Sequence, residues 1–173
     1  MIYDINPENP QPRLIAKVVD ELKKGGVIAY PTDTVYGIGC DISNYAHVSN
    51  RAYRVMRHLL PGPYTFILKA TRLVPKLMVS KRKTVGIRVP DNNICLEILK
   101  MLGHPIVSTS ASFSEYDIFT DAQEIDIRLG HILDIIINGG DVGTEPSTVI
   151  DLTDDENFVV LREGKGEVSM FLT

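Results

Sequence analysis

The chain of 173 residues contains two cysteines, no tryptophan and no long uninterrupted apolar segment. Cys40 and Cys95 are too few and too far apart for a disulfide framework or a zinc site, and free thiols are typical of a reducing compartment. No apolar run approaches the ~20 residues of a membrane-spanning helix. The first residues lack the basic and apolar regions of a secretory signal peptide. We therefore expect a cytoplasmic protein that does not bind membranes.

The chain has no excess of positive charge, because 18 Lys and Arg residues are outnumbered by 22 Asp and Glu residues, which gives a formal net charge of −4. This value gives no support to bulk attraction for nucleic acids or anionic membranes, so a polyanion would have to bind a local basic patch. The short basic run at residues 81–83 is interpreted as a solvated surface, with contact to an RNA backbone as the alternative. The length and the 44% apolar content predict a single globular domain over residues 1–173.

The most easily recognised catalytic and metal-binding motifs are absent. The sequence has no phosphate-binding G-x-x-x-x-G-K-[ST] loop, no H-E-x-x-H pair, no nucleophile elbow and no cluster of cysteine and histidine residues. These absences predict no resident metal, and they leave the catalytic residues unassigned.

The pattern of apolar residues indicates helices alternating with strands. Apolar residues recur three or four apart in four predicted helices, at residues 14–22, 50–60, 92–102 and 121–129. Short runs bounded by Gly, Pro or Asn predict strands at residues 27–30, 64–70, 85–89, 105–107, 132–137, 147–151 and 158–161. This order predicts an α/β fold with a mixed sheet.

Small hydroxyl residues and arginines gather near the ends of the predicted strands. Pro31 ends the first strand, and the chain is then expected to turn through Gly37 and Gly39. The candidate positions are Thr34, Thr84, Arg88, Ser108, Ser110, Ser147 and Arg162. Hydroxyls suit phosphate oxygens, and arginine forms a two-pronged pair with carboxylate or phosphate. Each serine and threonine cluster taken alone is also typical of a turn or a helix cap.

The order of six motifs is more specific than any one of them. PTDTVYGIGCD, PGPYTFIL, TVGIRVP, STSAS, PSTVIDL and LREG resemble, in this order, the YrdC-like threonylcarbamoyl-adenylate synthase family. The resemblance runs from about Leu14 to Gly166 and is strongest with the YciO-like branch, through NPENPQPRL, RAYRVMRHLLPGPYTFILKAT, SKRKTVGIRVP and VIDLTDD.

This resemblance implies a YrdC-like fold and a set of ligands. The fold would be a twisted open sheet of parallel and antiparallel strands, with flanking helices and a deep concave cavity. The substrates would be L-threonine, bicarbonate and ATP, with Mg²⁺ escorting the nucleotide. The products would be threonylcarbamoyl-AMP and pyrophosphate, made for the threonylcarbamoyl modification of tRNA.

The same resemblance implies roles for the candidate residues. Threonine would be held by Thr34, Arg88 and Ser147, and the nucleotide by Thr84, Ser108, Ser110 and Arg162. The reaction proceeds without a covalent enzyme intermediate, so it depends on positioning and on neutralising charge.

The family pattern is broken at two places. The family's Lys-x-Arg and Ser-x-x-Lys-Pro segment has no counterpart between Asn44 and Tyr45, which we interpret as a missing segment, with a genuine deletion as the alternative. Ser112 lies in the region where the synthases carry asparagine. The alternative function is therefore a YciO-like paralogue without synthase activity. It would bind tRNA or double-stranded RNA, or hydrolyse threonylcarbamoyl groups on tRNA with Asp33 as general base.

Overall fold

The structure is a computed structural model that describes residues 1–41, 46–70, 83–114 and 117–171. Its internal contacts divide the chain into two compact units. Unit 1 consists of Met1–Ser43 and Asp91–Thr144, and unit 2 of Asn44–Pro90 and Glu145–Thr173. The predicted gap at Asn44 and Tyr45 lies outside the described residues.

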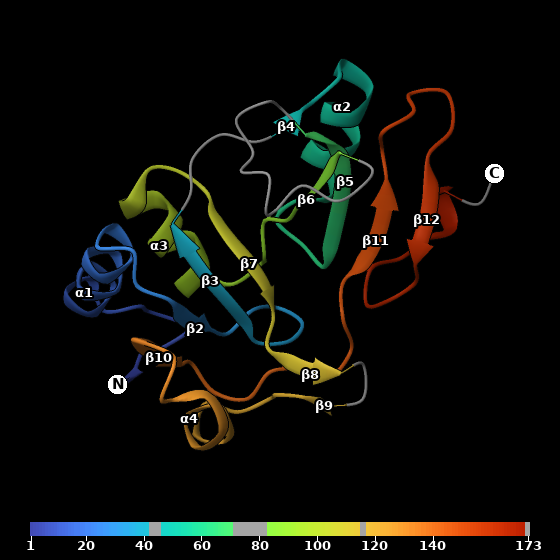
Figure 1. The fold of residues 1–173 in the computed structure, drawn as a ribbon. Coiled ribbons are helices and arrows are strands. Elements are labelled where there is room, and N and C mark those ends of the chain that lie inside the picture. The colour runs from blue at the N-terminus through green and yellow to red at the C-terminus, as the bar shows by residue number, and fades with distance from the viewer. Residues whose placement is uncertain (42–45, 71–82, 115–116, 172–173) are drawn as a thin grey trace. The chain divides into compact units, whose positions relative to one another are not determined.

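Unit 1 contains a five-stranded mixed sheet in the order β1-β10-β2-β3-β7 (Figure 1). The strands are β1 (Ile2–Asp4), β10 (Ile135–Asn138), β2 (Ile28–Tyr30), β3 (Gly37–Asp41) and β7 (Ile106–Ser110). The first three are parallel to one another, whereas β3 runs antiparallel to both β2 and β7. A two-stranded ribbon of β8 (Ser112–Ser114) and β9 (Asp117–Ile118) follows β7.

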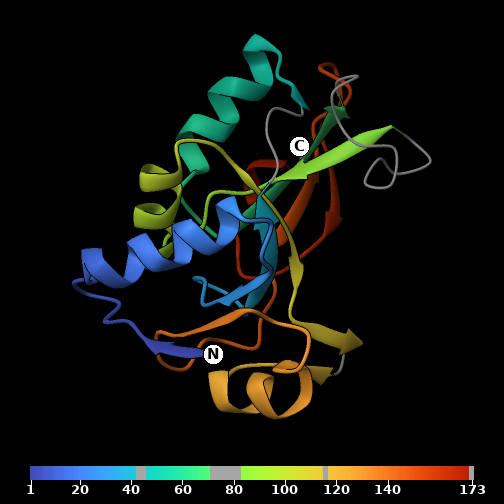
Figure 2. The same cartoon turned by 60° about the vertical axis from the view of Figure 1, so that its left-hand side comes forward.

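Three helices cover the two faces of this sheet. Because strand residues alternate between faces, Ile28 and Tyr30 pack against α1 (Pro12–Lys23) and α3 (Asn93–Leu102), whereas Ala29 packs against α4 (Ala122–Leu129). Figure 2 shows α1 and α3 on one side of the sheet and α4 on the other.

Local sequence signals set the ends of these helices. Asn92 Oδ1 accepts a hydrogen bond from Cys95 N at 3.2 Å, and Gly103 ends α3 with a φ of 84°. Asp121 Oδ1 accepts from Gln123 N at 2.6 Å at the start of α4. These contacts fix both ends of α3 and the start of α4.

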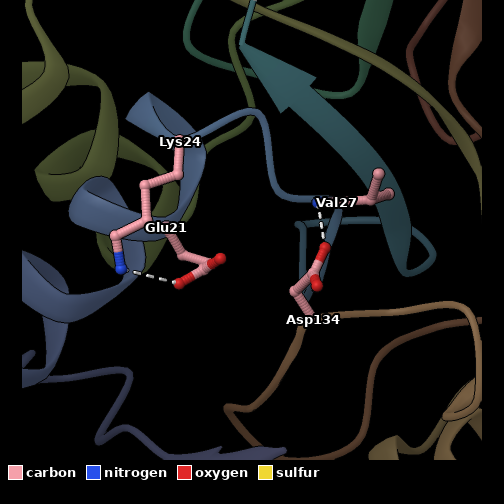
Figure 3. A network of polar contacts seen from close by, with 4 residues as sticks. All are labelled: Glu21, Lys24, Val27 and Asp134. Carbon is pink, nitrogen blue, oxygen red and sulfur yellow. Dashed lines mark hydrogen bonds and ion pairs between the residues drawn. The ribbon is translucent and has the colours of Figure 1, made fainter.

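The start of β2 is held by a side chain from the segment before β10. Asp134 Oδ2 accepts a hydrogen bond from Val27 N at 2.8 Å, while Lys24 Nζ lies 3.2 Å from Glu21 Oε2 at the end of α1 (Figure 3). The hydrogen bond between Val27 and Asp134 fixes the backbone where β2 begins. Strand β2 then leads directly into the Pro31–Thr34 turn.

Unit 2 contains the second five-stranded sheet, built around β5 (Tyr64–Ala70). Its order is β12-β11-β5-β4, and β6 also pairs with β5. The other strands are β4 (Ala46–His47), β6 (Thr84–Ile87), β11 (Thr148–Asp151) and β12 (Val159–Arg162). Only the β11–β5 pair is parallel among the described pairs of this sheet.

One helix and the sheet enclose the core of unit 2. Helix α2 (Asn50–Leu59) begins at Ser49, whose hydroxyl accepts from Ala52 N at 3.1 Å, and ends before Pro61. Its buried Ala52 packs with Phe66, Leu68 and Ile150 of the sheet. A short 3-10 helix, η1 (Ser169–Phe171), follows near the C-terminus.

The predicted fold class is confirmed, because in the described part of the chain the sheets are mixed and open and four α-helices accompany them. The strands form two five-stranded sheets among the described residues. None of the helices in the described ranges has the length and apolar character needed to span a bilayer.

Two local predictions are wrong, and one strand was missed. Gly37 and Gly39 form no turn, because both lie inside β3 and pair with β2 and β7. The ring of Tyr30 lies close to where their side chains would be. β7 extends to Ser110, so Ser108 and Ser110 lie within the strand and do not follow it. Strand β1 was not predicted, since three residues carry too little pattern.

Candidate functional site

The seven predicted site residues fall into two sets, one in each unit. Unit 1 contains Thr34, Ser108 and Ser110, and unit 2 contains Thr84, Arg88, Ser147 and Arg162. The convergence of both sets on one concave cavity stays a prediction.

The four residues of unit 2 share one face of its sheet. In β5, the side chains of Tyr64, Phe66 and Leu68 are buried in the core, so Thr65, Ile67 and Lys69 define the opposite face. Lys69 pairs with Thr84, and Arg88 follows β6 one position beyond the Phe66–Ile87 pair, which places it opposite Thr65. We call this surface, together with Ser147 and Arg162, the arginine face.

The register of β11 extends the arginine face to the edge of the sheet. Val149 pairs with Thr65 in β5 and with Arg162 in β12, so Arg162 lies on the face of Thr65. Ser147 is two residues before Val149 and therefore points the same way. The sequence placed these residues on separate segments, and the strand register brings them onto one face.

Ser147 lies at the centre of a hydrogen-bond network on the arginine face. Its hydroxyl is 2.8 Å from Thr65 Oγ1 and 3.3 Å from Arg162 Nη2. Arg162 also donates from Nε and Nη2 to the main-chain oxygen of Ser147, at 3.1 Å and 2.8 Å. Ser147 is 5% exposed, so its hydroxyl is nearly buried and is held on the arginine face by these contacts.

The adjacent threonine holds the loop after β12. Thr148 is fully buried, donates from Oγ1 to Gly166 O at 2.7 Å and accepts from Gly164 N at 3.0 Å. A Cβ at Gly164 would lie 2.4 Å from Pro146 O, so only glycine fits there. Thr65 and Thr148 were not predicted as site residues, although the PGPYTFIL and PSTVIDL motifs contain them.

In unit 1, the two predicted serines lie on a strand face next to two glycines. Ser110 pairs with Gly37 and Ser108 with Gly39. A Cβ at Gly37 would lie 2.9 Å from Tyr30 Cζ, and one at Gly39 would lie 2.8 Å from Val107 O. Both serines are exposed, so their hydroxyls are accessible for a ligand.

Thr34 belongs to a buried turn directly after β2. Thr32 Oγ1 donates to Val35 O at 2.6 Å and accepts from Thr34 N at 3.0 Å. The two hydroxyls also lie 3.2 Å apart, and either oxygen can donate in this contact. The side chain of Thr34 is fully buried.

A buried tyrosine connects this turn region to the glycines after β10. Tyr36 Oη donates to Gly140 O at 3.1 Å. Burial is the main cause that raises the pKa of Tyr36 to about 12, with smaller contributions from the charges of Asp121 and Asp141. Gly140 has a φ of +90°, a conformation that glycine adopts readily.

The described residues contain no group of three or more His, Cys, Asp or Glu side chains that could hold a metal ion. The predicted site residues bear hydroxyl and guanidinium groups. Such groups bind carboxylates and phosphates through charge-assisted hydrogen bonds. The fold and the site thus define an α/β protein with mixed open sheets and an arginine- and hydroxyl-bearing sheet face.

Within that class the chain belongs to the Sua5, YciO and YrdC family. The sequence model of this family, described as "Telomere recombination", matches residues 20–49 and 41–164. The two matched ranges overlap at residues 41–49, so the family model matches this chain in two pieces.

The chain is similar to YciO of Escherichia coli K12, an uncharacterized protein, at 43% identity over 98% of each chain. That alignment extends over 207 positions, more than the 173 residues of this chain, so YciO has residues without a counterpart here. The crystal structure of E. coli YciO matches with a TM-score of 0.91 and covers 99% of both chains.

The chain is also similar to proteins with a named activity or ligand. Threonylcarbamoyl-AMP synthase of Mus musculus is 30% identical over 84% of this chain and 65% of its own length. The crystal structure of P. abyssi Sua5 complexed with L-threonine matches at 26% identity with a TM-score of 0.84. It covers 95% of this chain and 57% of the Sua5 chain.

Proposed function

We propose that this protein forms threonylcarbamoyl-adenylate from L-threonine, bicarbonate and ATP. The observation that carries the proposal is the arginine face, where the strand register sets Arg88, Thr84, Ser147 and Arg162 on one side of the unit 2 sheet. The relatives named as synthases and the threonine complex of Sua5 support the same chemistry.

The arginine face suits the carboxylate end of the amino acid. Arg88 is half-buried beyond β6, where its planar guanidinium can pair with a carboxylate through two parallel hydrogen bonds. Ser147 lies on the same face with its hydroxyl held by Thr65 and Arg162. Thr34 in unit 1 is assigned to threonine as well, because the PTDTVYGIGCD motif that contains it resembles that of the synthases.

The remaining residues are assigned to the nucleotide. Ser108 and Ser110 expose hydroxyls from β7, and Thr84 and Arg162 lie on the arginine face. Phosphate oxygens accept hydrogen bonds from such groups, and the guanidinium also opposes their charge. Magnesium would arrive with the nucleotide, since phosphate oxygens and water molecules supply oxygen ligands to this ion.

The reaction needs no enzyme nucleophile. The threonine nitrogen bonds to the carbon of bicarbonate and water leaves, which gives a carbamate. A carbamate oxygen then attacks the α-phosphorus of ATP, and the bond to the pyrophosphate oxygen breaks. Fixed arginine and hydroxyl groups lower the barrier by orienting the reactants and by stabilising the charge that develops on phosphate oxygens.

The direct test is product formation by the complete 173-residue chain. Protein is incubated with α-labelled ATP, Mg²⁺, L-threonine and bicarbonate, and threonylcarbamoyl-AMP is identified by mass spectrometry. Pyrophosphate release should require both threonine and bicarbonate, and omission of either should abolish it. If the folded protein binds threonine but forms no adenylate, the proposed reaction is rejected. The proposed threonine site is then kept.

We infer a second candidate function because the chain is 43% identical over whole chains to YciO, an uncharacterized protein, and 30% identical to the mouse synthase. In this case the protein binds RNA or removes threonylcarbamoyl groups from tRNA. Asp33, half-buried between Thr32 and Thr34, would act as general base for water. Loss of the modified nucleoside from tRNA on incubation with the protein, measured by nucleoside mass spectrometry, would support hydrolysis.

A further inference from the structure

Thr65 lies in the middle of the arginine face, although the sequence did not mark it as a site residue. Its strand, β5, lies between β11 and β6 (Figure 1). Thr65 pairs with Val149 on one side and lies opposite Arg88 on the other. Gly62 N donates to Val89 O at 2.9 Å, so the two segments stay side by side beyond Arg88. Thr65 is therefore a direct neighbour of Arg88, since opposed residues have Cβ atoms about 4.5–5.5 Å apart.

The orientation of the Thr65 side chain is set from two sides. Its hydroxyl oxygen lies 2.8 Å from Ser147 Oγ, on the β11 side. Its methyl group faces β6, because a Cβ at Gly86 would lie 3.2 Å from Thr65 Cγ2. A β-branched side chain has few χ1 rotamers, so these two contacts hold the hydroxyl toward Ser147. Thr65 is half-buried, so this part of the arginine face is accessible to a ligand.

The hydroxyls of Thr65 and Ser147 together have one hydrogen to spare. They contain two hydrogens, and their 2.8 Å contact uses one of them, whichever oxygen donates. The contact between Arg162 Nη2 and Ser147 Oγ uses a hydrogen of the guanidinium. In the part of the chain that the structure describes, neither hydroxyl forms another hydrogen bond. One hydroxyl hydrogen is therefore available to a ligand.

We propose that Thr65 is a positioning residue of the threonine site. Thr65 donates its hydrogen to Ser147 Oγ and thereby leaves the Ser147 hydrogen for the carboxylate of the substrate. Ser147 Oγ then accepts from both Thr65 and Arg162, and a hydroxyl that accepts from a cation becomes a stronger donor. The carboxylate receives this hydrogen bond together with those of Arg88, which lies opposite Thr65.

This inference rests on the proposed binding of threonine and does not depend on formation of the adenylate. A carboxylate has only lone pairs, which match the guanidinium of Arg88 and the hydrogen of Ser147. A carboxamide brings N–H groups to a guanidinium that has no acceptor, so it fits poorly. By fixing the Ser147 hydroxyl, Thr65 adds to the preference of the site for a free carboxylate.

The test measures binding of L-threonine and of L-threoninamide by calorimetric titration, with an ATP analogue present. Thr65→Val keeps the shape of the side chain and removes its hydroxyl. It should weaken threonine binding about three- to tenfold, the range of one net hydrogen bond. Threoninamide binding should weaken less, so the preference for the carboxylate should shrink. Thr65→Ser keeps the hydroxyl and should restore most of the threonine affinity.

A double-mutant cycle shows whether Thr65 acts through Ser147. In the Ser147→Ala background, Thr65→Val should cause no further loss of affinity, because the hydroxyl that Thr65 positions is gone. Equal losses in both backgrounds would mean that Thr65 contacts the substrate itself, and the positioning role would be overturned. The matched control is Thr153→Val, at a half-buried threonine beyond the other end of β11, and it should bind threonine like the wild type.

Unchanged threonine affinity in a folded Thr65→Val protein would overturn the inference and leave the proposed function intact. Equal weakening by Thr65→Val and Thr65→Ser, with a lower melting temperature in both, would indicate lost packing and would overturn it too. A wild-type protein that binds no threonine would reject the proposed substrate and this inference together.

Discussion

Arg162 holds the main-chain oxygen of Ser147 with two nitrogens, Nε at 3.1 Å and Nη2 at 2.8 Å, across the β12–β11 pair. The contact connects Arg162, which is predicted to bind the nucleotide, with Ser147, which is predicted to bind the substrate threonine. It means that the two cannot be altered independently, because a change at Arg162 releases the segment that carries Ser147.

We therefore expect Arg162→Ala to affect both stability and binding. The substitution leaves the buried oxygen of Ser147 without these donors, which should lower the free energy of unfolding by about 1–3 kcal/mol. Threonine affinity should also fall, since Ser147 Oγ loses its 3.3 Å contact. Urea denaturation and calorimetric titration of threonine measure the two effects. Arg13→Ala, an exposed arginine of α1, is the control and should change neither.

Arg88→Lys tests the proposed carboxylate site on the arginine face. Lysine keeps the charge but lacks the planar fork, so threonine binding should weaken about tenfold or more. Calorimetric titration with and without an ATP analogue measures the change. If Arg88 only fastens neighbouring segments, the melting temperature will fall while threonine affinity stays the same, and the residue must then be removed from the site.

Gly37→Ala tests the close contact between β3 and Tyr30. The added Cβ would lie 2.9 Å from Tyr30 Cζ, and the ring is 6% exposed and packed in the core, so it cannot move freely. We expect a loss of about 1–3 kcal/mol in the free energy of unfolding. Gly86→Ala in β6 is the matched control, because its Cβ would lie 3.2 Å from Thr65 Cγ2 on an open face. Equal losses in the two variants would contradict the explanation.

The raised pKa of Tyr36 predicts how the free energy of unfolding changes at alkaline pH. Its pKa is raised from 10.0 to about 12 in the folded protein, so the folded state keeps a proton that the unfolded state has lost between these values. The stabilisation is complete below pH 10 and is lost as the pH rises toward 12, by roughly 2–3 kcal/mol. Denaturation curves at successive pH values should show the loss in the wild type, and a smaller loss in Tyr36→Phe. The same pH slope in both proteins would exclude Tyr36 as the cause.

Much of the local structure follows from the sequence alone. Asn92 and Gly103 mark the ends of α3, Pro61 ends the chain's second helix, and the alternation in Tyr64–Ala70 defines a strand. These features depend on interactions between residues close in sequence, where capping, fixed proline geometry and side-chain periodicity act. The ordered motifs also identified the family, because they preserve residue types along the whole chain.

Only the tertiary structure decided which residues share a surface. The sequence indicated a turn at Gly37 and Gly39, but the ring of Tyr30 from the neighbouring strand requires glycine there. It could not show that Arg162 holds Ser147, because the strand register that pairs Val149 with both Thr65 and Arg162 depends on long-range pairing. Local propensities set the type of each element, whereas cross-strand register sets which side chains meet.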